Sequence, residues 1–284
     1  MKVVQDTAVH MVIPSKDLQF LLGHIDRVEV LNDNGFDASV LVYWGLPEMQ
    51  RLVRLYGDAP SPMDKEYDWP GLYTPFIHQR ITASYLALRD RAFCFNEAGT
   101  GKTSSVIWAA DYLMNQGLVK RVLVICPLSI MYSAWQADIF KTAMHRTVDV
   151  AHGPTQKRQR IINGAYEFVI INFDGLGTVF EDVKRANFDL IVIDEANAYK
   201  TVTTKRWKTL NKILMPSTRL WMLTGTPASQ SPLDAFGLAR LVAPGNVPKY
   251  FGSWRDTVMQ QITRFKWIPR KNAKDIVFNA LQPA

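Results

Sequence analysis

Five short apolar runs in the middle of the chain constrain its fold more than any other feature. They lie at residues 92–95, 122–126, 168–171, 190–193 and 220–223. Amphipathic stretches with helical spacing separate them, among them 103–115, 130–141 and 205–214. Strands that are apolar on both faces are typical of a parallel sheet covered by helices on each side. We therefore expect an α/β fold of this kind for the body of the chain.

The first 60 residues follow a different pattern. Runs of alternating polarity at 8–13, 27–31 and 39–43 predict short antiparallel strands, and the stretch 47–56 predicts a helix that ends at Gly57. Residues 61–72 have no clear period and contain two prolines. We expect a small α+β module over 1–60, a linker over 61–72, an α/β domain over 73–245 and an extension over 246–284.

The charge of the chain is unevenly distributed. The net charge is +7, but residues 1–60 hold five Lys/Arg against eight Asp/Glu, whereas residues 73–284 hold 27 against 15. A basic body favours a polyanionic partner, although an ordinary basic domain would look the same. Two local clusters could contact phosphates or could be solvated helix faces; they comprise Lys157, Arg158 and Arg160, and Lys205, Arg206, Lys208 and Lys212.

The chain lacks the sequence signals of membrane or secreted proteins. It has no apolar run near the roughly 18 residues that span a bilayer and no signal-peptide core at its start. Cys94 and Cys126 each close an apolar run, which favours reduced core thiols over a disulfide. The five histidines show no metal-ligand spacing, so we expect no zinc. We expect a cytoplasmic protein without a membrane, in the host cytoplasm if it is viral.

Residues 96–103 read Asn-Glu-Ala-Gly-Thr-Gly-Lys-Thr and lie between a predicted strand and a predicted helix. A phosphate-binding loop needs glycines, inward N–H groups and a helix N-terminus. Lys102 would reach the β- and γ-phosphates of ATP, and the Thr103 hydroxyl would bind magnesium. The strict pattern begins with glycine, where this chain has Asn96; the alternative is a glycine turn before an ordinary helix. The predicted nucleotide-binding residues are Glu97, Ala98, Gly99, Thr100, Gly101, Lys102 and Thr103.

The apolar run at 190–193 ends in two adjacent carboxylates, Asp194 and Glu195. Ligands of parallel sheets bind at the carboxyl ends of the strands. Asp194 is suited to hold magnesium, and Glu195 to deprotonate a water molecule that attacks the γ-phosphate. A helix cap beside a surface acid would give the same residues, but their combination with Lys102 favours catalysis.

In this order, residues 96–103, 194–197 and 223–227 resemble motifs I, II and III of superfamily-two helicases, most closely the Swi/Snf-type translocases. The resemblance covers about residues 72–284 and implies a RecA-like lobe. It also implies that Asn197, Thr224 and Thr226 couple the nucleotide state to motion. The family usually has histidine where this chain has Asn197.

Further segments match the family less specifically. Gln79 stands where the family reads adenine, and its amide can donate and accept at once, although a helix surface residue is the alternative. Pro127, Ser129 and Asn172 stand in segments that contact the nucleic-acid backbone in the family. Trp135 follows the first of these segments, and we expect it to pack in the core.

Motors of this family close ATP between two RecA-like lobes, and arginines of the second lobe typically contribute 10³–10⁵ in rate. No second set of motifs follows in the 284 residues. We therefore expect this chain to bind ATP and magnesium but to hydrolyse ATP slowly without that lobe.

The resemblance implies a nucleic-acid-dependent ATPase that remodels or branch-migrates duplex DNA. The alternatives are an RNA helicase of the same superfamily, the motor subunit of a restriction or defence complex, and a P-loop enzyme that does not act on nucleic acid. The module over 1–60 could grip DNA or serve a structural or partner-binding role.

Overall fold

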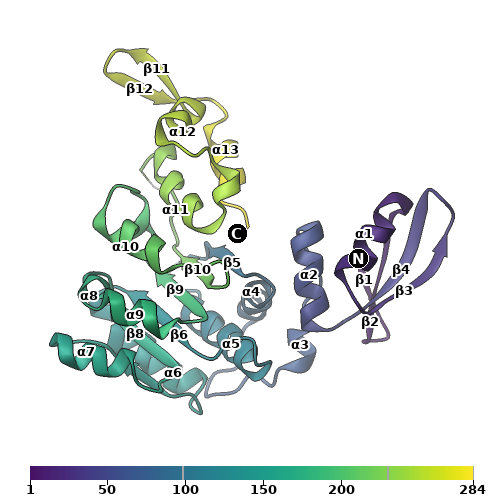
Figure 1. The fold of residues 1–284 in the computed structure, drawn as a ribbon, viewed down its shortest axis with the longest axis horizontal. Coiled ribbons are helices and arrows are strands. Elements are labelled where there is room, and N and C mark those ends of the chain that lie inside the picture. Colours follow the sequence, from purple (N-terminus) through teal and green to yellow (C-terminus); the bar gives the residue numbers. More distant parts are fainter. Residues whose placement is uncertain (98, 229, 284) are drawn as a thin grey trace. The chain divides into compact units, whose positions relative to one another are not determined.

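The computed structural model describes residues 1–97, 99–228 and 230–283, and the chain forms two compact units (Figure 1). The N-terminal unit consists of residues 1–68 and 83–89. The second unit consists of residues 69–82 and the chain from Asp90 onward. Helix α4, Ile77–Ala87, contributes residues to both.

The N-terminal unit contains a four-stranded antiparallel sheet with the order β1-β2-β4-β3. The strands are β1 Lys2–Val4, β2 Ala8–Pro14, β3 Val28–Asp33 and β4 Asp37–Tyr43. Alternate residues of β2 and β4 are buried, so one face of the sheet packs in the core. The three predicted strands and their antiparallel arrangement are confirmed. Strand β1 was missed because three residues are too few to show a period.

Helices complete the core of this unit. Helix α1, Leu18–His24, and helix α2, Leu46–Tyr56, bury Leu21, Leu46, Met49 and Leu52 completely or nearly so. Helix α2 was predicted, and it ends at Gly57, whose φ of +84° is easily reached only by glycine. A short helix α3, Met63–Glu66, occupies the stretch that we expected to be a linker, and its Met63 is fully buried.

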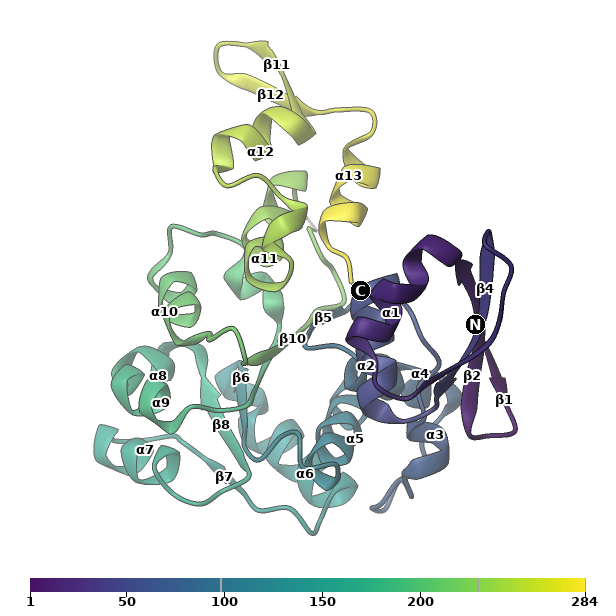
Figure 2. The same cartoon turned by 45° about the vertical axis from the view of Figure 1, so that its right-hand side comes forward.

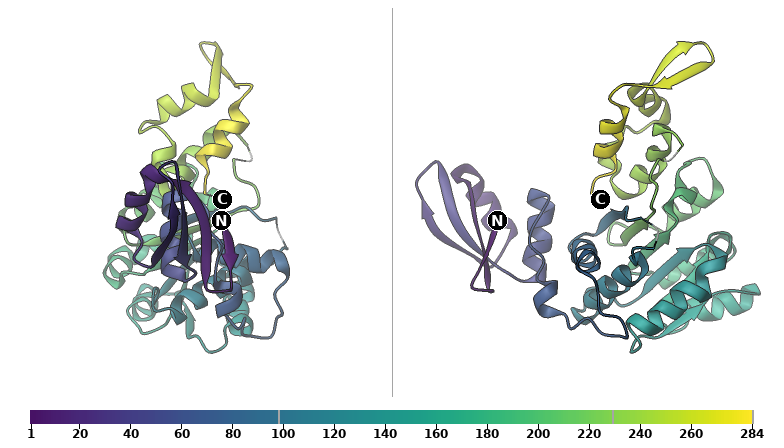
Figure 3. Two further views of the ribbon diagram at one scale, coloured as in Figure 1. Left: turned by 90° about the vertical axis from the view of Figure 1, so that its right-hand side faces the viewer. Right: turned by 180° about the vertical axis from the view of Figure 1, so that it is seen from behind.

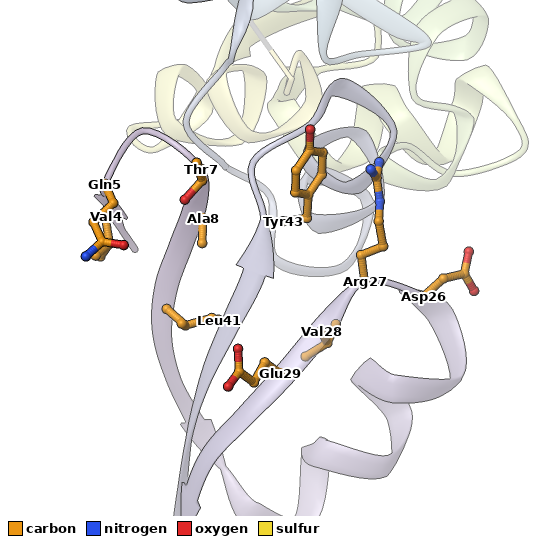
Figure 4. Close-up of a pocket in the computed structure, with 10 residues that line it drawn as sticks. All are labelled: Val4, Gln5, Thr7, Ala8, Asp26, Arg27, Val28, Glu29, Leu41 and Tyr43. Atoms are coloured by element: carbon orange, nitrogen blue, oxygen red, sulfur yellow. The ribbon is translucent and has the colours of Figure 1, made fainter.

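The other face of this sheet carries an open cavity of about 530 Å³ (Figure 4). Arg27 and Tyr43 stand at its rim, with the guanidinium carbon 3.8 Å from the ring centroid. The same guanidinium donates two hydrogen bonds of 2.7 Å to the buried carboxylate of Glu48. The positive charge of Arg27 is therefore neutralised within the unit, and Asp26 and Glu29 are the other charged residues of the lining.

The second unit is built on a six-stranded parallel sheet with the order β5-β10-β9-β6-β8-β7. The strands are β5 Arg91–Cys94, β6 Val122–Cys126, β7 Val148–Val150, β8 Phe168–Asn172, β9 Leu190–Asp194 and β10 Arg219–Leu223. All five predicted apolar runs are strands of this sheet, so the predicted parallel architecture is confirmed.

Helices cover both faces of this sheet (Figures 1 and 3). On one face, side chains such as Leu123 and Ile193 join a large apolar cluster with helices α7 to α11. These helices are α7 Thr155–Ile162, α8 Phe173–Thr178, α9 Phe180–Ala186, α10 Lys205–Ile213 and α11 Ala235–Val242. On the other face lie α5, Lys102–Asn115, and α6, Ala137–Thr142. Trp108 of α5 is fully buried there.

The predicted helix over 130–141 is only partly regular. A 3₁₀ turn at Leu128–Ile130 leads into a π-helical turn at Met131–Gln136, and α6 follows. A π-turn holds one more residue than an α-turn and therefore shifts the side chains that follow it. Trp135 lies in this turn and is fully buried, which confirms its predicted place in the core.

The chain after residue 246 forms a helix, a hairpin and a second helix, none of which was predicted (Figure 2). They are α12 Phe251–Val258, β11 Met259–Thr263 with β12 Lys266–Pro269, and α13 Ala273–Ala280. The end of the chain returns to the main sheet, where the N–H of Phe93 in β5 donates to the Pro283 carbonyl at 3.0 Å. Within the described residues, no helix combines the length and hydropathy needed to cross a bilayer.

The two cysteines are free and buried in the sheet. Cys94 ends β5 and Cys126 ends β6, and strands β10 and β9 lie between these two strands. Burial raises the pKa of the Cys126 thiol to about 12, so this thiol stays protonated and unreactive at neutral pH. The prediction of reduced core thiols is confirmed.

Candidate nucleotide-binding site

The strand order brings the separate motifs to one edge of the sheet. Carboxyl ends of parallel strands share an edge, and along this edge β5, β10, β9, β6 and β8 follow one another. The phosphate loop follows β5, Thr224 follows β10 and Glu195 follows β9. Pro127 follows β6, and Phe173 follows β8. Residues up to 130 positions apart in the sequence thus line one surface.

The loop between β5 and α5 has the backbone that a phosphate cradle requires. Gly99 and Gly101 have φ angles of +80° and +76°, in the left-handed region that disfavours other residues. A Cβ atom at Gly101 would also overlap the side-chain amide of Gln79. The Lys102 ammonium donates to the carbonyls of Asn96 and Glu97, both at 2.8 Å. Ala98 lies outside the described residues.

Gln79 lies against this loop rather than on an open helix surface. Its Nε2 donates to the Thr100 carbonyl at 3.3 Å, and its Oε1 accepts from the Phe76 N–H at 2.9 Å. The side chain is about nine-tenths buried. The structure therefore places Gln79 beside the predicted nucleotide-binding residues, where it supports the turn at Gly101.

Asp194, at the end of β9, is held from two sides. The Trp135 indole N–H donates to its Oδ2 at 2.9 Å, and the Glu195 N–H donates to its Oδ1 at 2.9 Å. Burial raises the pKa of Asp194, and these two hydrogen bonds and the charge of Lys102 offset part of that rise. Lys102 begins α5 directly after the phosphate loop, and β10 lies between β5 and β9 in the sheet, so motif I and motif II lie at the same edge.

Glu195 has an unusual backbone for a glutamate. Its φ and ψ are both 58°, and it is exposed. Non-glycine residues in this region are strained by about 1–3 kcal/mol and cluster at functional sites. Thr103 lies in the first turn of α5, and among the described residues no hydrogen bond joins its hydroxyl to the side chain of Asp194 or Glu195.

Asn197 joins motif II to motif III directly. Its Nδ2 donates to Thr224 Oγ1 at 3.1 Å, to the Thr226 carbonyl at 2.9 Å and to Thr226 Oγ1 at 3.2 Å. The amide Oδ1 is buried and has no partner in the described part of the chain. Asparagine therefore forms a link between the two motifs at the position where the family usually has histidine.

The residues predicted to contact nucleic acid lie farther along the same edge. Pro127 and Ser129 follow β6, and Asn172 ends the neighbouring strand β8. Ser129 is exposed, whereas the side-chain Oδ1 of Asn172 accepts a hydrogen bond from Arg158 at 3.1 Å. Arg206 similarly pairs with Asp174 at 2.9 Å. In each basic cluster one arginine, Arg158 or Arg206, thus contacts a residue in or just after β8. The lysines of both clusters are exposed.

A comparison with known protein families decides the assignment. The SNF2-related domain matches residues 78–280. The chain belongs to this family. The resemblance to Swi/Snf-type translocases is thereby confirmed, and the matched range includes all three motifs at the sheet edge.

Individual proteins with similar sequences agree with this assignment. The SWI/SNF-related matrix-associated actin-dependent regulator of chromatin subfamily A-like protein 1 of Xenopus laevis is 28% identical over 190 residues, which are 63% of this chain and 18% of that protein. The chromodomain-helicase-DNA-binding protein 6 of Homo sapiens is 25% identical over 223 residues, 72% of this chain and 8% of that protein. The chain thus spans less than a fifth of the length of these relatives.

A solved structure shares the fold. The Sulfolobus solfataricus SWI2/SNF2 ATPase core in complex with dsDNA superposes with a TM-score of 0.60 and 22% sequence identity. The match covers 75% of this chain and 44% of that chain. The SNF2-related domain described here therefore has the fold of one part of that ATPase core.

Two residues of this SNF2-related domain have structural roles that the sequence did not show. The hydrogen bond from Trp135 to Asp194 crosses 59 positions of the chain, and the sequence indicated only a buried tryptophan. Lys200 donates to Gln230 and Asp234 at 2.7 and 3.2 Å, which ties the segment after motif II to the segment after motif III. The sequence signal for Lys200 is its position just beyond motif II, where Swi/Snf-type translocases also have a lysine.

The site fits a magnesium–nucleotide complex. Gly99 and Gly101 have the left-handed φ angles with which backbone N–H groups can turn toward a phosphate, and the Gln79 amide packs where a Cβ atom at Gly101 would lie. Asp194 and Thr103 offer a carboxylate and a hydroxyl oxygen, the hard ligands that magnesium prefers. Among the described residues, no group of three or more His, Cys, Asp or Glu side chains is placed to hold a metal ion.

Proposed function

We propose that this SNF2-related domain is the ATP-binding lobe of a DNA-dependent ATPase that translocates on duplex or branched DNA. One observation carries the proposal: one edge of the sheet holds both the phosphate loop with Lys102, after β5, and Asp194, at the end of β9, and Asn197 joins the motif of Asp194 to Thr224 and Thr226. A nucleotide-binding group, a catalytic group and a connection to a third motif are thus parts of one surface. A chromatin regulator and a chromodomain-helicase-DNA-binding protein are among the relatives, and the solved ATPase core is in complex with dsDNA, which supports DNA as the partner.

ATP would bind with its phosphates against the loop from Glu97 to Thr103. The N–H groups of this loop and the N-terminus of α5 would face the phosphate oxygens. Lys102 would exchange the carbonyls of Asn96 and Glu97 for the β- and γ-phosphates. Gln79 would contact the adenine edge from its position beside Thr100. Thr103 and Asp194 would hold magnesium, which neutralises charge on the β- and γ-phosphates when bound.

Glu195 would act as the general base. Its exposed carboxylate directly follows Asp194, and its left-handed backbone turns the chain away from β9 at that point. It would remove a proton from water as the water oxygen attacks the γ-phosphorus in line with the leaving ADP oxygen. Asn197 would then pass the change in nucleotide state to Thr224 and Thr226.

DNA would run along the part of the edge that β6 and β8 supply. Pro127, Ser129 and Asn172 would contact its backbone, and the exposed lysines of the basic clusters would add contacts independent of base sequence. A second RecA-like lobe would complete the ATP site. We also propose the division into a module over 1–60, a linker over 61–72, a lobe over 73–245 and an extension over 246–284, and an intracellular location, where DNA and ATP occur together.

The test measures nucleotide binding and ATPase activity of the chain with single-stranded, duplex and branched DNA and with RNA. We expect micromolar binding of ATP with magnesium, loss of binding in Lys102→Ala, and retained binding without turnover in Glu195→Gln. General bases typically contribute about 10²–10⁴ in rate. Absence of nucleotide binding at millimolar ATP and magnesium would refute the proposal, and stimulation by RNA alone would favour an RNA helicase.

A further inference from the structure

The hairpin formed by β11 and β12 is firmly fixed at its base (Figures 1 and 2). Met259, its first residue, is buried, and Trp267 packs against the apolar cluster of the lobe. The Arg255 guanidinium of α12 stacks on Trp267, with its carbon 4.1 Å from the ring centroid. Arg270 closes the base through its N–H, which donates to the Val258 carbonyl at 2.9 Å. The hairpin is therefore a rigid projection of the second unit.

The tip of the hairpin exposes a phenylalanine. Thr263 Oγ1 accepts the N–H of Lys266 at 3.1 Å, and Gln261 Nε2 donates to the Arg264 carbonyl at 3.3 Å, so the turn is ordered by its own hydrogen bonds. Phe265 in this turn is 88% exposed. Full burial of a phenylalanine side chain is worth about 1.5–3 kcal/mol. The fold does not gain this stabilisation at Phe265, so a partner that covers the ring could gain it.

The chain on both sides of this ring in the sequence carries only positive charge. Residues 257–274 contain no Asp or Glu, and their basic residues are Arg264, Lys266, Arg270, Lys271 and Lys274. The Arg264 guanidinium carbon lies 5.5 Å from the Phe265 ring centroid. Within the described parts of the chain, no ion pair engages these five basic side chains. The charges therefore remain available to a partner.

The combination of an exposed ring and unpaired cations indicates the chemistry of the partner. Cations bind the phosphates of any nucleic acid, but an aromatic ring needs a base whose face is accessible. Bases inside a continuous duplex stack on one another and leave no free face. Accessible faces occur where strands separate, at a branch point or a strand end.

We propose that the β11–β12 hairpin binds branched DNA by stacking Phe265 on the first unpaired or terminal base at the junction, while Arg264 and Lys266 contact the flanking phosphates. The inference rests on the proposed function, because it assumes that this domain acts on DNA. It goes beyond it by assigning junction recognition to a particular element, outside the three motifs and outside the segments that contact duplex DNA. An acidic protein partner would use the same charges but would not require an aromatic ring.

The first test compares, at one salt concentration, the affinity for a forked DNA and for a relaxed, covalently closed circular duplex, which has no branch point and no strand end. Stacking of one base is worth about 1–3 kcal/mol, so Phe265→Ala should weaken fork binding about 5- to 100-fold. Phe265→Tyr should keep the affinity because the ring remains, whereas Phe265→Leu should behave like alanine. Duplex affinity should change less than about twofold in all three variants. Phe140→Ala, which removes a ring of α6 that is 64% exposed, is the matched control and should change neither affinity.

A second test places the photo-crosslinking amino acid p-benzoylphenylalanine at position 265. Crosslinks should map to the junction base of the fork and should be absent from the duplex. Crosslinks spread evenly along both DNAs, or a Phe265→Leu variant as active as the unaltered chain, would overturn the proposal. Stronger Phe265-dependent binding to an RNA fork than to a DNA fork would overturn the assignment to DNA.

The two proposals fail in different ways. If the unaltered chain binds ATP but no DNA of any kind, the proposed function is refuted and the hairpin proposal with it. If the chain binds duplex DNA and Phe265→Ala binds the fork as tightly as the unaltered chain, only the hairpin proposal is refuted. The tip residue is exposed and contributes nothing to the core, so its substitution should leave the thermal unfolding of the chain unchanged.

Discussion

Two opposing effects act on the ionisation of the Asp194 carboxyl group. Burial favours its neutral form, whereas the proposed binding of magnesium requires the carboxylate, and the Trp135 indole stabilises that carboxylate through a hydrogen bond. Because the net shift raises the pKa of Asp194, magnesium-dependent nucleotide binding should be lost on acidification at a higher pH than an ordinary aspartate would give. The stability contribution has the corresponding sign: it is present below the unfolded pKa and is lost as pH rises through the folded pKa.

We predict that Trp135→Phe moves this acid loss to still higher pH, since it removes a hydrogen bond that lowers the pKa of Asp194. The measurement is the affinity for a magnesium–nucleotide complex as a function of pH. Trp254→Phe is the matched control, because the Trp254 indole is also buried and donates to the Pro232 carbonyl. An identical pH midpoint in Trp135→Phe and the control would contradict the assigned role.

We predict that Asn197→Ala uncouples nucleotide binding from turnover. The substitution removes all three hydrogen bonds to Thr224 and Thr226, each worth about 0.5–1.5 kcal/mol net. Nucleic-acid-stimulated ATPase activity should fall about tenfold or more, while nucleotide affinity stays within about threefold. Asn163→Ala, which removes an amide bonded to Asp182, controls for loss of a side-chain amide elsewhere. An equal effect of both variants would show that Asn197 only stabilises the fold.

At the scale of elements, uninterrupted runs of apolar residues were the sequence property that best predicted the strands. Strands β6, β8, β9 and β10 bury nearly every residue, so their runs needed no knowledge of tertiary structure to be recognised. Strand β7 was missed because it has only three residues, one of them Asp149. The hairpin was missed because most of its residues are exposed and follow no apolar pattern. Sequence periodicity reports burial, and these elements bury little.

The site divides along a similar line. Local geometry, such as the turn at Gly99 and Gly101, follows from residue types and could be predicted. The contacts of Trp135 and Lys200 depend on the strand order and on a π-turn, which join residues 59 and 30 positions apart. Neither the order of strands in a sheet nor an extra residue in a helical turn leaves a periodic signal in one sequence.

We predict that Gly237→Ala destabilises the second unit. Helix α11 packs so closely on the chain after motif II that a Cβ atom at Gly237 would overlap the Lys200 carbonyl. Overpacking of this kind typically costs about 1–3 kcal/mol. Gly252→Ala in α12 is the control, because nothing lies within 4 Å of its added atom. Urea denaturation should show a lower free energy of unfolding for Gly237→Ala alone; equal values would indicate that the helix shifts without cost.

At the scale of the whole molecule, the strand order separates sequence neighbours and joins distant segments. Strand β5 carries the phosphate loop, yet β10 is the strand that pairs with it, and Pro283 supplies a hydrogen bond to its Phe93. Motifs I and II follow β5 and β9, and β10, which leads to motif III, lies between these two strands. The two motifs therefore reach one edge of the sheet only when β10 is in place. The nucleotide site is a property of the complete sheet.

We predict that a chain ending at residue 216 fails to bind nucleotide although it retains Lys102, Asp194 and Glu195. It lacks β10, so β5 has no strand to pair with. A chain ending at residue 258 is the control: it keeps all six strands and should retain nucleotide binding, weakened by the loss of α13. Isothermal titration with ATP and magnesium measures both, and binding by the shorter chain within about threefold of the unaltered chain would contradict the prediction.

The pairing of β5 with β10 also has a consequence for biosynthesis. The ribosome makes Cys94 some 125 residues before Arg219, which at 5–20 residues per second takes roughly 6–25 seconds. During that interval β5 and the glycine loop that follows it have no β10 to pair with. They are accessible to chaperones and to other nascent chains. Slower translation downstream of β5 would lengthen that exposure, so the soluble yield of this protein should depend on codon choice between these two strands.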